Sequence, residues 1–190
     1  LPTLYELDDG AGWVVYLSTF SKILAPGIRV GWVVAPPAVL RKMNLGKQAA
    51  DLCSSTFTQR FVTEYLKRND YRDHVARLNG IYRGRRDTML QALEARFPST
   101  ATWTRPRGGL FVWATLPDYI DTKHLQARAL ERHVAFVPGE AAFLDGRGRS
   151  SMRLNFSGVS ESLITEGIGR LGEVVSEFCS LHDALNPGRS

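Results

Sequence analysis

Apolar residues in the first part of the chain fall in two short continuous runs, a pattern that is typical of strands. The runs are Trp13–Leu17 and Val30–Ala35, which are rich in β-branched and aromatic residues and are bounded by turn-forming Gly and Pro. Because neither run alternates apolar and polar residues, we expect buried strands in a sheet that is covered on both faces. The polar segment 18–29 would connect them.

The spacing of apolar residues changes to three- and four-residue steps after Ala38. This spacing predicts helical structure from Ala38 to about Arg68. A longer amphipathic helix follows, because its apolar stripe runs from Tyr71 to Leu93 with a single polar break at Arg85. Pro98 would end that helix, since proline disfavours helical geometry in the residue before it.

The remaining elements predict an α+β segment. The expected strands are Ala101–Thr104, Leu110–Ala114, Ala135–Val137 and Met152–Phe156, and the expected helices are Thr122–His133 and one that Ser160 and Glu161 cap and that reaches Phe178. The first two strands bracket Arg105–Gly109, which indicates a hairpin or a bend. We expect the module boundary within residues 46–80 and fraying of residues 186–190.

Composition indicates a globular protein. The 190 residues are 44% apolar, 23% charged and 10% aromatic, which excludes collagen-like, low-complexity and disordered classes. Two cysteines, Cys53 and Cys179, are too few for a disulfide-stapled secreted scaffold, so we expect a cytoplasmic protein. No apolar run approaches the ~20 residues of a membrane helix, and no membrane partner is expected. The first residues include neither a Met nor a secretory signal, so we expect the chain to start inside a longer protein.

The net charge of +5 raises the question of nucleic-acid binding. Arg and Lys are scattered through Arg68–Arg86 and Arg147–Arg153 among acidic residues, without the spaced aromatics of a stacking surface. Solvated helix faces therefore explain the charge better than a nucleic-acid site.

Common catalytic templates are absent from the sequence. The four histidines form neither a His-Glu-x-x-His motif nor a Cys/His cluster, so no metal is expected. The Gly-x-Gly within Asp145–Arg149 does not join a strand to a helix, which makes a dinucleotide loop a weak interpretation. A Gly-x-Ser-x-Gly nucleophile motif does not occur.

The segment from Thr19 to Arg29 has a more specific chemistry. Lys22 leaves the carboxyl end of a predicted strand, where ligands bind in open α/β sheets. Partial desolvation and a nearby cation would lower the pKa of its amine and make it a nucleophile able to form a Schiff base. The hydroxyls of Thr19 and Ser21 and the fork of Arg29 are suitable phosphate donors. The alternative is an ordinary polar loop between strands.

Five segments in order resemble the fold-type I pyridoxal-phosphate aminotransferases, in the branch that acts on α-aminoadipate, kynurenine, aromatic or branched-chain amino acids. The segments are Ser18–Trp32 (STFSKILAPGIRVGW), Lys47–Leu52 (KQAADL), Thr104–Trp113 (TRPRGGLFVW), Val134–Gly139 (VAFVPG) and Met152–Ser157 (MRLNFS). The resemblance spans nearly the whole chain, from about Leu1 to Phe178.

This resemblance implies a role for each matching residue. Lys22 would form the Schiff base with pyridoxal 5′-phosphate and shuttle the proton during transamination. Arg29 would bind the cofactor phosphate, with the hydroxyls of Thr19 and Ser21 as further donors. Arg153 would hold the α-carboxylate of the substrate in a bidentate pair. Gly108-Gly109 and Trp113 are better explained as turn and packing residues.

The implied fold is α/β: the C-terminal part of the large cofactor domain, with a mostly parallel sheet and helices, followed by an α+β small domain. We assign residues 1–45 to the end of the large domain, 46–80 to connecting helices and 81–190 to the small domain. The family's phosphate-binding glycine loop, ring-stacking aromatic, asparagine and Asp-x-x-Tyr strand have no counterpart, and Asp8 and Asp9 lie too close to Lys22 to replace that aspartate. We therefore expect activity only in a longer parent chain.

Three functions remain open. The first is the C-terminal half of an aminotransferase that acts on amino acids and 2-oxo acids, as a homodimer. The second is the aminotransferase-like effector domain of a winged-helix transcription regulator of the GntR/MocR type, which would bind nucleic acid through an upstream region. The third is a fragment without function of its own, whose exposed sheet edge favours association. The sequence does not identify the amino donor.

Overall fold

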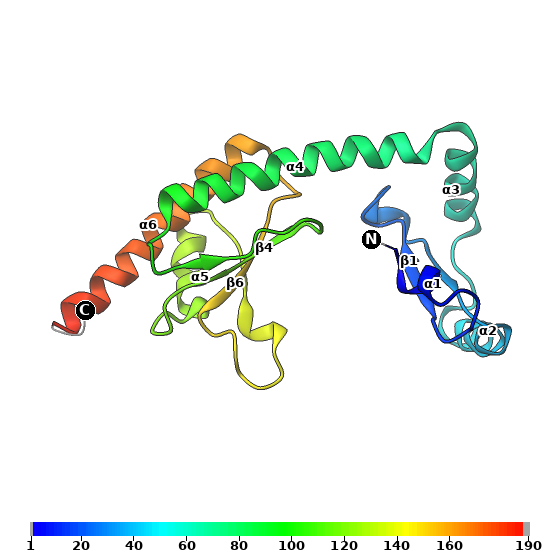
Figure 1. Ribbon diagram of the computed structural model, residues 1–190, viewed down its shortest axis with the longest axis horizontal. Helices are drawn as coiled ribbons and strands as arrows, with labels where there is room; N and C mark the ends of the chain where they lie inside the picture. Colours follow the sequence, from blue (N-terminus) through cyan, green and yellow to red (C-terminus); the bar gives the residue numbers. More distant parts are fainter. Residues whose placement is uncertain (1, 188–190) are drawn as a thin grey trace. The chain divides into compact units, whose positions relative to one another are not determined.

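The chain forms two compact units whose boundary falls between Leu78 and Asn79, inside the long helix α4 (Figure 1). This computed structural model describes residues 2–187. Each unit contains one antiparallel sheet together with helices. Residues 188–190, part of the segment expected to fray, lie outside the described range.

The first unit is built around a two-stranded sheet. Its elements are α1 (Leu4–Leu7), β1 (Tyr16–Thr19), the 3-10 helix η1 (Pro26–Ile28), β2 (Gly31–Val34), α2 (Pro37–Asp51), α3 (Thr56–Arg68) and the first part of α4 (Tyr71–Arg96). The strands β1 and β2 pair antiparallel, with Tyr16 opposite Val34 and Thr19 opposite Gly31. Helix α1 was not predicted, although Thr3 and Glu6 form the capping box that marks its start.

The expectation that these first strands are buried was wrong. Trp13 is 87% exposed and Leu17 is 65% exposed, and β1 begins only at Tyr16. Residues 20–30 form a turn that reverses the chain, so β1 and β2 pair antiparallel, whereas parallel strands need a longer crossover. Within residues 2–187 no further strand joins this sheet, so none of the parallel pairing of the expected large domain occurs in this part of the chain.

The predicted helical stretch from Ala38 to Arg68 is two helices, because the backbone turns at Leu52, where φ is 62°. Ser55 then caps α3 by accepting a hydrogen bond from the Thr58 N–H at 3.4 Å. The long amphipathic helix is confirmed as α4, which ends at Arg96, before Pro98. The polar break in its stripe has a structural reason, since the Arg85 guanidinium donates to the carbonyl oxygen of Ser157 at 2.5 Å.

The second unit packs helices against one face of a four-stranded antiparallel sheet. Its strands lie in the order β3 (Thr102–Trp103), β4 (Phe111–Thr115), β6 (Ser151–Asn155) and β5 (Val137–Pro138). The other elements are the remainder of α4, α5 (Thr122–Glu131), the 3-10 helix η2 (Gly139–Ala142) and α6 (Glu161–Leu185). The hairpin between β3 and β4 and the Ser160 cap of α6 are both confirmed.

Alternate residues of β4 and β6 form the sheet side of the core. Val112, Ala114, Met152 and Leu154 are buried against apolar residues of α4, α5 and α6, including Leu93, Leu125, Leu171 and Val175. The intervening residues of the same strands therefore lie on the opposite face of the sheet. Among the helices of residues 2–187, none is long and apolar enough to cross a membrane.

Candidate functional site

Lys22 lies in a tight turn that directly follows β1. The N–H groups of Leu24 and Ala25 both donate to the carbonyl oxygen of Phe20, at 2.8 and 3.2 Å, and so close the base of the turn. The N–H of Phe20 donates to the carbonyl of Val30 at 3.0 Å, which extends the pairing of β1 and β2 by one step. The turn that carries Lys22 is therefore anchored to the end of the two-stranded sheet.

The side chain of Lys22 is exposed. No carboxylate of residues 2–187 forms an ion pair with its ammonium group. The partial desolvation expected from the sequence is absent from this part of the chain, because the sheet beside the turn has only two strands and little covers them. Lys22 is thus an unpaired amine held on an ordered turn.

Hydroxyl and guanidinium donors lie at the end of β1 and in the connection between β1 and β2. The Thr19 Oγ1 accepts a hydrogen bond from the Ser21 N–H at 3.2 Å, which fixes the start of the turn. Arg29 has a left-handed backbone, with φ of 51°, and its guanidinium donates to the Pro26 carbonyl at 3.1 Å. No carboxylate in the described part of the chain pairs with Arg29, so most of its donors are unused by this chain.

Arg153 belongs to the second unit and lies on β6, an inner strand of the four-stranded sheet. Its neighbours Met152 and Leu154 are buried in the core, so the arginine is on the opposite face, where it is exposed. The guanidinium carbon lies 4.3 Å from the centre of the Phe111 ring. The ring supports the cation without using its hydrogen-bond donors.

Aromatic residues occupy the same face of the sheet as Arg153. Trp113, which is opposite Arg153 in the strand register, contacts the Phe143 ring edge-on with 6.0 Å between ring centres. This packing role agrees with the interpretation from the sequence, as does the positive φ of Gly109 in the loop of the hairpin. On this face the guanidinium of Arg153 is the group suited to a carboxylate, whose two oxygens match its donors.

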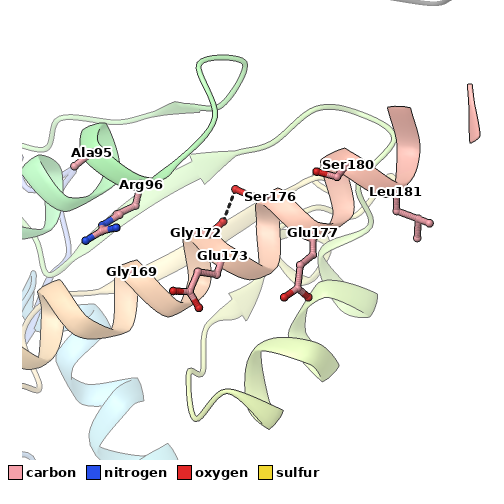
Figure 2. A pocket seen from close by; sticks show the side chains of 9 residues that line it. All are labelled: Ala95, Arg96, Gly169, Gly172, Glu173, Ser176, Glu177, Ser180 and Leu181. Carbon is pink, nitrogen blue, oxygen red and sulfur yellow. Dashed lines mark hydrogen bonds between the residues drawn. The ribbon is translucent and has the colours of Figure 1, made fainter. Parts of the chain in front are cut away.

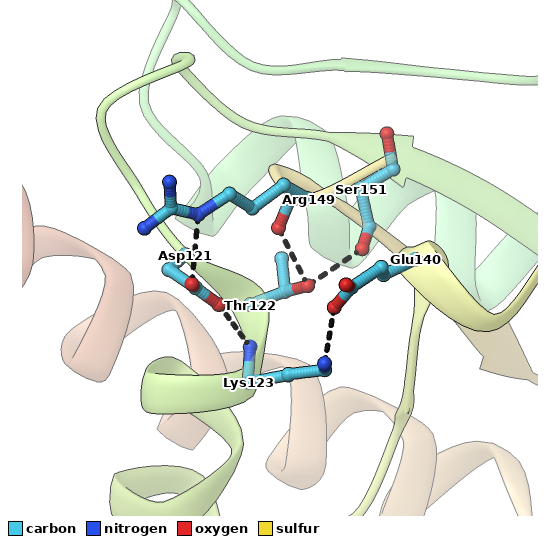
Figure 3. Close-up of polar contacts among 6 residues, drawn as sticks. All are labelled: Asp121, Thr122, Lys123, Glu140, Arg149 and Ser151. Atoms are coloured by element: carbon cyan, nitrogen blue, oxygen red, sulfur yellow. Dashed lines mark hydrogen bonds and ion pairs between the residues drawn. The ribbon is translucent and has the colours of Figure 1, made fainter. Parts of the chain in front are cut away.

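A polar network joins the start of β6 to helix α5, and the sequence analysis missed it. The Arg149 Nε donates to the Asp121 carboxylate at 2.8 Å, and the Thr122 hydroxyl lies 2.9 Å from the carbonyl oxygens of both Arg149 and Ser151 (Figure 3). Asp121 also accepts from the Lys123 N–H at 2.8 Å, while the Lys123 ammonium pairs with Glu140. The N-cap pattern at Asp121 was a usable signal, but nothing local indicated that Thr122 is buried.

The charge of Asp121 is stabilised by this network. Burial acts to raise the pKa of its carboxyl group, but the hydrogen bonds from Arg149 and from the Lys123 N–H outweigh burial and lower the pKa below its usual value. The negative charge also lies at the N-terminus of α5, where the helix dipole favours it. The next residue, Thr122, links this network to the strand that carries Arg153, because its hydroxyl donates to the carbonyl oxygen of Ser151, the first residue of β6.

Grooves on the second unit do not coincide with the predicted site residues. One groove runs between the end of α4 and the middle of α6, where Arg96, Gly169, Gly172 and Ser176 lie along its walls (Figure 2). Within residues 2–187 no cluster of His, Cys, Asp or Glu could hold a metal ion. The structure therefore places Thr19 at the end of β1, Ser21, Lys22 and Arg29 in the connection from β1 to β2, and Arg153 on the sheet of the second unit.

Comparison with known proteins gives a consistent result. Residues 2–171 match the family described as "Aminotransferase class I and II". Aromatic-amino-acid aminotransferase 1 of Thermococcus litoralis is 48% identical over 169 residues, which cover 89% of this chain and 40% of that protein. LysN, the α-aminoadipate aminotransferase of Thermus thermophilus complexed with N-(5′-phosphopyridoxyl)-L-leucine, matches with a TM-score of 0.92 and 40% identity, over 95% of this chain and 47% of LysN.

A relative of another kind is also similar. YdfD, an uncharacterized HTH-type transcriptional regulator of Bacillus subtilis, is 33% identical over 172 residues, which cover 90% of this chain and 35% of the regulator. The chain thus spans less than half the length of each of these relatives. Its α/β fold is that of the aminotransferase structures.

Proposed function

The chain belongs to the class I and II aminotransferases, and from that premise we propose that its protein moves the α-amino group of an amino acid to a 2-oxo acid with pyridoxal 5′-phosphate as cofactor. Lys22 holds the cofactor through its ε-amine. Thr19, Ser21 and Arg29 bind the cofactor phosphate. Arg153 binds the α-carboxylate of the substrate.

The Lys22 turn is the observation that carries this proposal. An amine that reacts with an aldehyde must be unpaired, and no carboxylate of residues 2–187 pairs with Lys22. Two hydrogen bonds to the Phe20 carbonyl hold the backbone turn that carries this lysine. The nearby donors also fit a phosphate, since the fork of Arg29 is matched to phosphate oxygens and hydroxyls can donate to them. The residues present therefore fit the cofactor.

The chemistry divides between the cofactor and the chain. Bound pyridoxal phosphate supplies an electron sink that makes the substrate Cα–H acidic. Once the amino group of the substrate has replaced it on the cofactor, the freed Lys22 amine would take the proton from Cα as a general base and would deliver it to the cofactor carbon C4′ as a general acid. Arg153 grips both oxygens of the α-carboxylate and so fixes the direction of the Cα–H bond.

The residues of this chain supply part of such a site. The stacking aromatic, the asparagine and the aspartate that the family resemblance implies for the cofactor ring have no matching segment here. We therefore propose that the chain corresponds to the C-terminal half of the enzyme, with residues 1–45 from the large domain, 46–80 as connecting helices and 81–190 as the small domain. The boundary between compact units at Leu78 and Asn79 supports this division.

Reductive trapping tests the proposal directly. The full-length protein is incubated with pyridoxal phosphate, reduced with borohydride and digested, and the labelled peptide is identified by mass spectrometry. We expect the label on Lys22 and its loss in Lys22→Arg, which keeps the charge but removes the nucleophile. Lys47→Arg is the matched control and should label normally. A label on Lys42 or Lys47, or no label, would overturn the assignment.

The similarity to YdfD favours a second candidate, the effector domain of a transcription regulator. Lys22 would bind the same cofactor, but the output would be altered DNA binding by an upstream helix-turn-helix region. The two candidates separate when the full-length protein is assayed for transamination and for a gel shift with DNA. Turnover without a shift supports the enzyme, and a ligand-dependent shift without turnover supports the regulator.

We also propose that the whole protein is a cytoplasmic homodimer. Large apolar side chains of the first unit, among them Trp13, Leu52 and Phe57, are 75% exposed or more and would be covered in an assembly. Cys53 and Cys179 are free thiols, which fits a reducing compartment. Sedimentation equilibrium of the full-length protein measures the assembly, and a monomer at micromolar concentration would contradict it.

A further inference from the structure

The backbone of the Lys22 turn has a side-chain partner that is distant in sequence. The Nε2 of His74, on the first turn of α4, lies 2.9 Å from the carbonyl oxygen of Ile23, the residue directly after Lys22. The two residues are 51 positions apart, and both belong to the first unit. The imidazole is partly buried, so this contact is sheltered from water.

Two neighbours fix the tautomer of His74. A carbonyl oxygen can only accept, so Nε2 must carry the proton toward Ile23. The Arg77 guanidinium lies 3.3 Å from Nδ1 and can only donate, so Nδ1 is the acceptor. One neutral tautomer satisfies both contacts, and the ring is therefore an oriented donor.

The orientation of the ring is also fixed by packing. Tyr65, near the end of α3, contacts the imidazole edge-on with 6.0 Å between ring centres and 80° between the planes. The ring is thus held by Tyr65, by Arg77 on its own helix and by the Ile23 carbonyl. A donor held in this way limits the movement of the peptide group that it contacts.

The Ile23 carbonyl lies in the part of the turn that internal hydrogen bonds do not reach. The bonds from Leu24 and Ala25 both end on the Phe20 carbonyl, at the base of the turn. His74 holds the peptide group one residue beyond Lys22 and so restricts rotation of the backbone next to that lysine. The base and the apex of the turn therefore have separate supports.

We propose that His74 is a positioning residue, which sets the direction of the Lys22 side chain by holding the Ile23 carbonyl. The consequence for chemistry rests on the proposed function of Lys22, whereas the effect on the turn does not. A lysine that serves as cofactor anchor and proton carrier must occupy the same place in every turnover, and a misplacement of about 1 Å can cost about a hundredfold in rate.

Two amide variants form the matched test. In His74→Gln the side-chain amide nitrogen can reach approximately the place of Nε2 and keeps an N–H donor, whereas in His74→Asn the same group is one methylene shorter and cannot reach Ile23. His74→Leu removes the donor altogether. His124→Gln, on the exposed surface of α5, controls for the loss of a histidine. If His74→Leu fails to fold, the Gln and Asn variants carry the test.

The first measurement needs no cofactor. Hydrogen–deuterium exchange of the full-length protein reports on the amides of residues 20–25, with residues 151–156 as the reference segment. We expect exchange in 20–25 to rise about five- to tenfold in His74→Leu and His74→Asn, as the loss of one hydrogen bond implies, and to stay near wild type in His74→Gln. The reference segment should be unchanged.

The second measurement reports on the lysine. With pyridoxal phosphate and borohydride, the initial rate of label formation at Lys22 should fall by about tenfold in His74→Leu and His74→Asn and be restored in His74→Gln. A purely structural role would lower the unfolding midpoint and raise exchange in both segments, without this pattern of rescue. The unfolding midpoint of each variant is therefore measured in parallel.

The outcomes separate the two proposals. Unchanged exchange in residues 20–25 of His74→Asn, or equal effects of Gln and Asn, overturns the role of His74. Absence of any label on Lys22 in the wild type overturns the proposed function, while the exchange result still decides whether His74 holds the turn. A third outcome is that hydrogen exchange in residues 20–25 rises in His74→Asn and returns to normal in His74→Gln, while the rate of label formation at Lys22 is normal in every variant. This would show that the contact does not direct Lys22, which also overturns the proposal.

Discussion

The guanidinium of Arg153 lies over the ring of Phe111, with 4.3 Å between the guanidinium carbon and the ring centre. The two residues are diagonal neighbours on β6 and β4, because Phe111 is opposite Asn155 and Arg153 is opposite Trp113. The ring orients the cation and leaves its N–H donors free for a ligand. The arrangement supports a carboxylate-binding role for Arg153.

Replacing Arg153 by Ala should weaken binding of an amino-acid substrate to the cofactor-loaded, full-length protein by about 2–5 kcal/mol, the usual cost of losing a buried charged contact. The affinity of Arg153→Lys should lie between those of the wild type and Arg153→Ala, because an ammonium group keeps the charge but lacks the two parallel donors of a guanidinium. Absorbance titration with the amino acid gives the dissociation constant. Arg147→Ala, on an exposed loop, is the control, and an equal effect there would argue against a specific role of Arg153.

Phe111→Leu should have a smaller effect on the same binding constant. The substitution keeps an apolar side chain but removes the ring face, which contributes about 0.5–1 kcal/mol to an exposed cation. Binding should therefore weaken by about two- to fivefold, while the midpoint of urea unfolding changes little. Phe143→Leu, whose ring faces Arg147 at 5.3 Å instead, is the comparison. Unchanged binding in Phe111→Leu would show that the ring does not orient Arg153.

Asp121→Asn should remove one pH-dependent part of the stability. The folded carboxyl group has a lowered pKa, whereas its pKa in the unfolded chain is about 3.9, so the unfolded state binds the proton more readily. This stabilisation is present above the unfolded pKa and is lost as pH falls through the folded pKa. The Asn oxygen can still cap α5, but the amide NH2 cannot accept from the Arg149 Nε, so the variant removes the charge together with that contact. Urea unfolding should show a larger wild-type advantage at pH 7 than at pH 3.

Gly172→Ala should destabilise the second unit. A Cβ at this position would lie 2.6 Å from the carbonyl oxygen of Arg96, where α6 packs against α4, and such overpacking costs about 1–3 kcal/mol. Gly169→Ala is the matched control, because open space surrounds that position in the same helix (Figure 2). In Gly169→Ala the better helix propensity of alanine should raise the free energy of unfolding by up to about 1 kcal/mol. Equal changes in the urea midpoint would contradict close packing at Gly172.

The 190-residue chain by itself should show no transamination. It lacks the residues that the family resemblance places around the cofactor ring, and Lys22 is exposed rather than enclosed. The assay is formation of the 2-oxo acid with pyridoxal phosphate and a panel of amino acids, compared with the full-length protein. Turnover by the short chain alone would show that its residues suffice for the reaction.

Local sequence patterns predicted the elements well where the structure depends on neighbours in the chain. The stripe from Tyr71 to Leu93 gave helix α4, Pro98 lay just beyond its end, and the glycines between two apolar runs gave the β3–β4 hairpin. The capped start of α6 at Ser160 was equally local. Helical spacing, caps and turn residues act within a few positions, so a single sequence is enough to recognise them.

The same patterns failed where burial depends on distant segments. The apolar run around Trp13 indicated a buried strand. Burial requires other strands or helices to pack on it, and the two-stranded sheet leaves Trp13 exposed. Arg85 interrupts the apolar stripe of α4, and only its hydrogen bond to the Ser157 carbonyl, 72 positions away, explains why a polar residue lies there. Likewise, no local signal linked His74 to the Lys22 turn.

The sequence alone therefore determined the long helix α4, the capped start of α6, the hairpin and the position of Lys22 directly after a strand, since these follow from local periodicity and turn chemistry. Only the tertiary structure decided that Lys22 is exposed, that His74 holds the next peptide group and that Phe111 lies under Arg153. The physical reason is that burial and side-chain pairing depend on which distant segments meet in space, and periodicity along the chain does not encode that meeting directly.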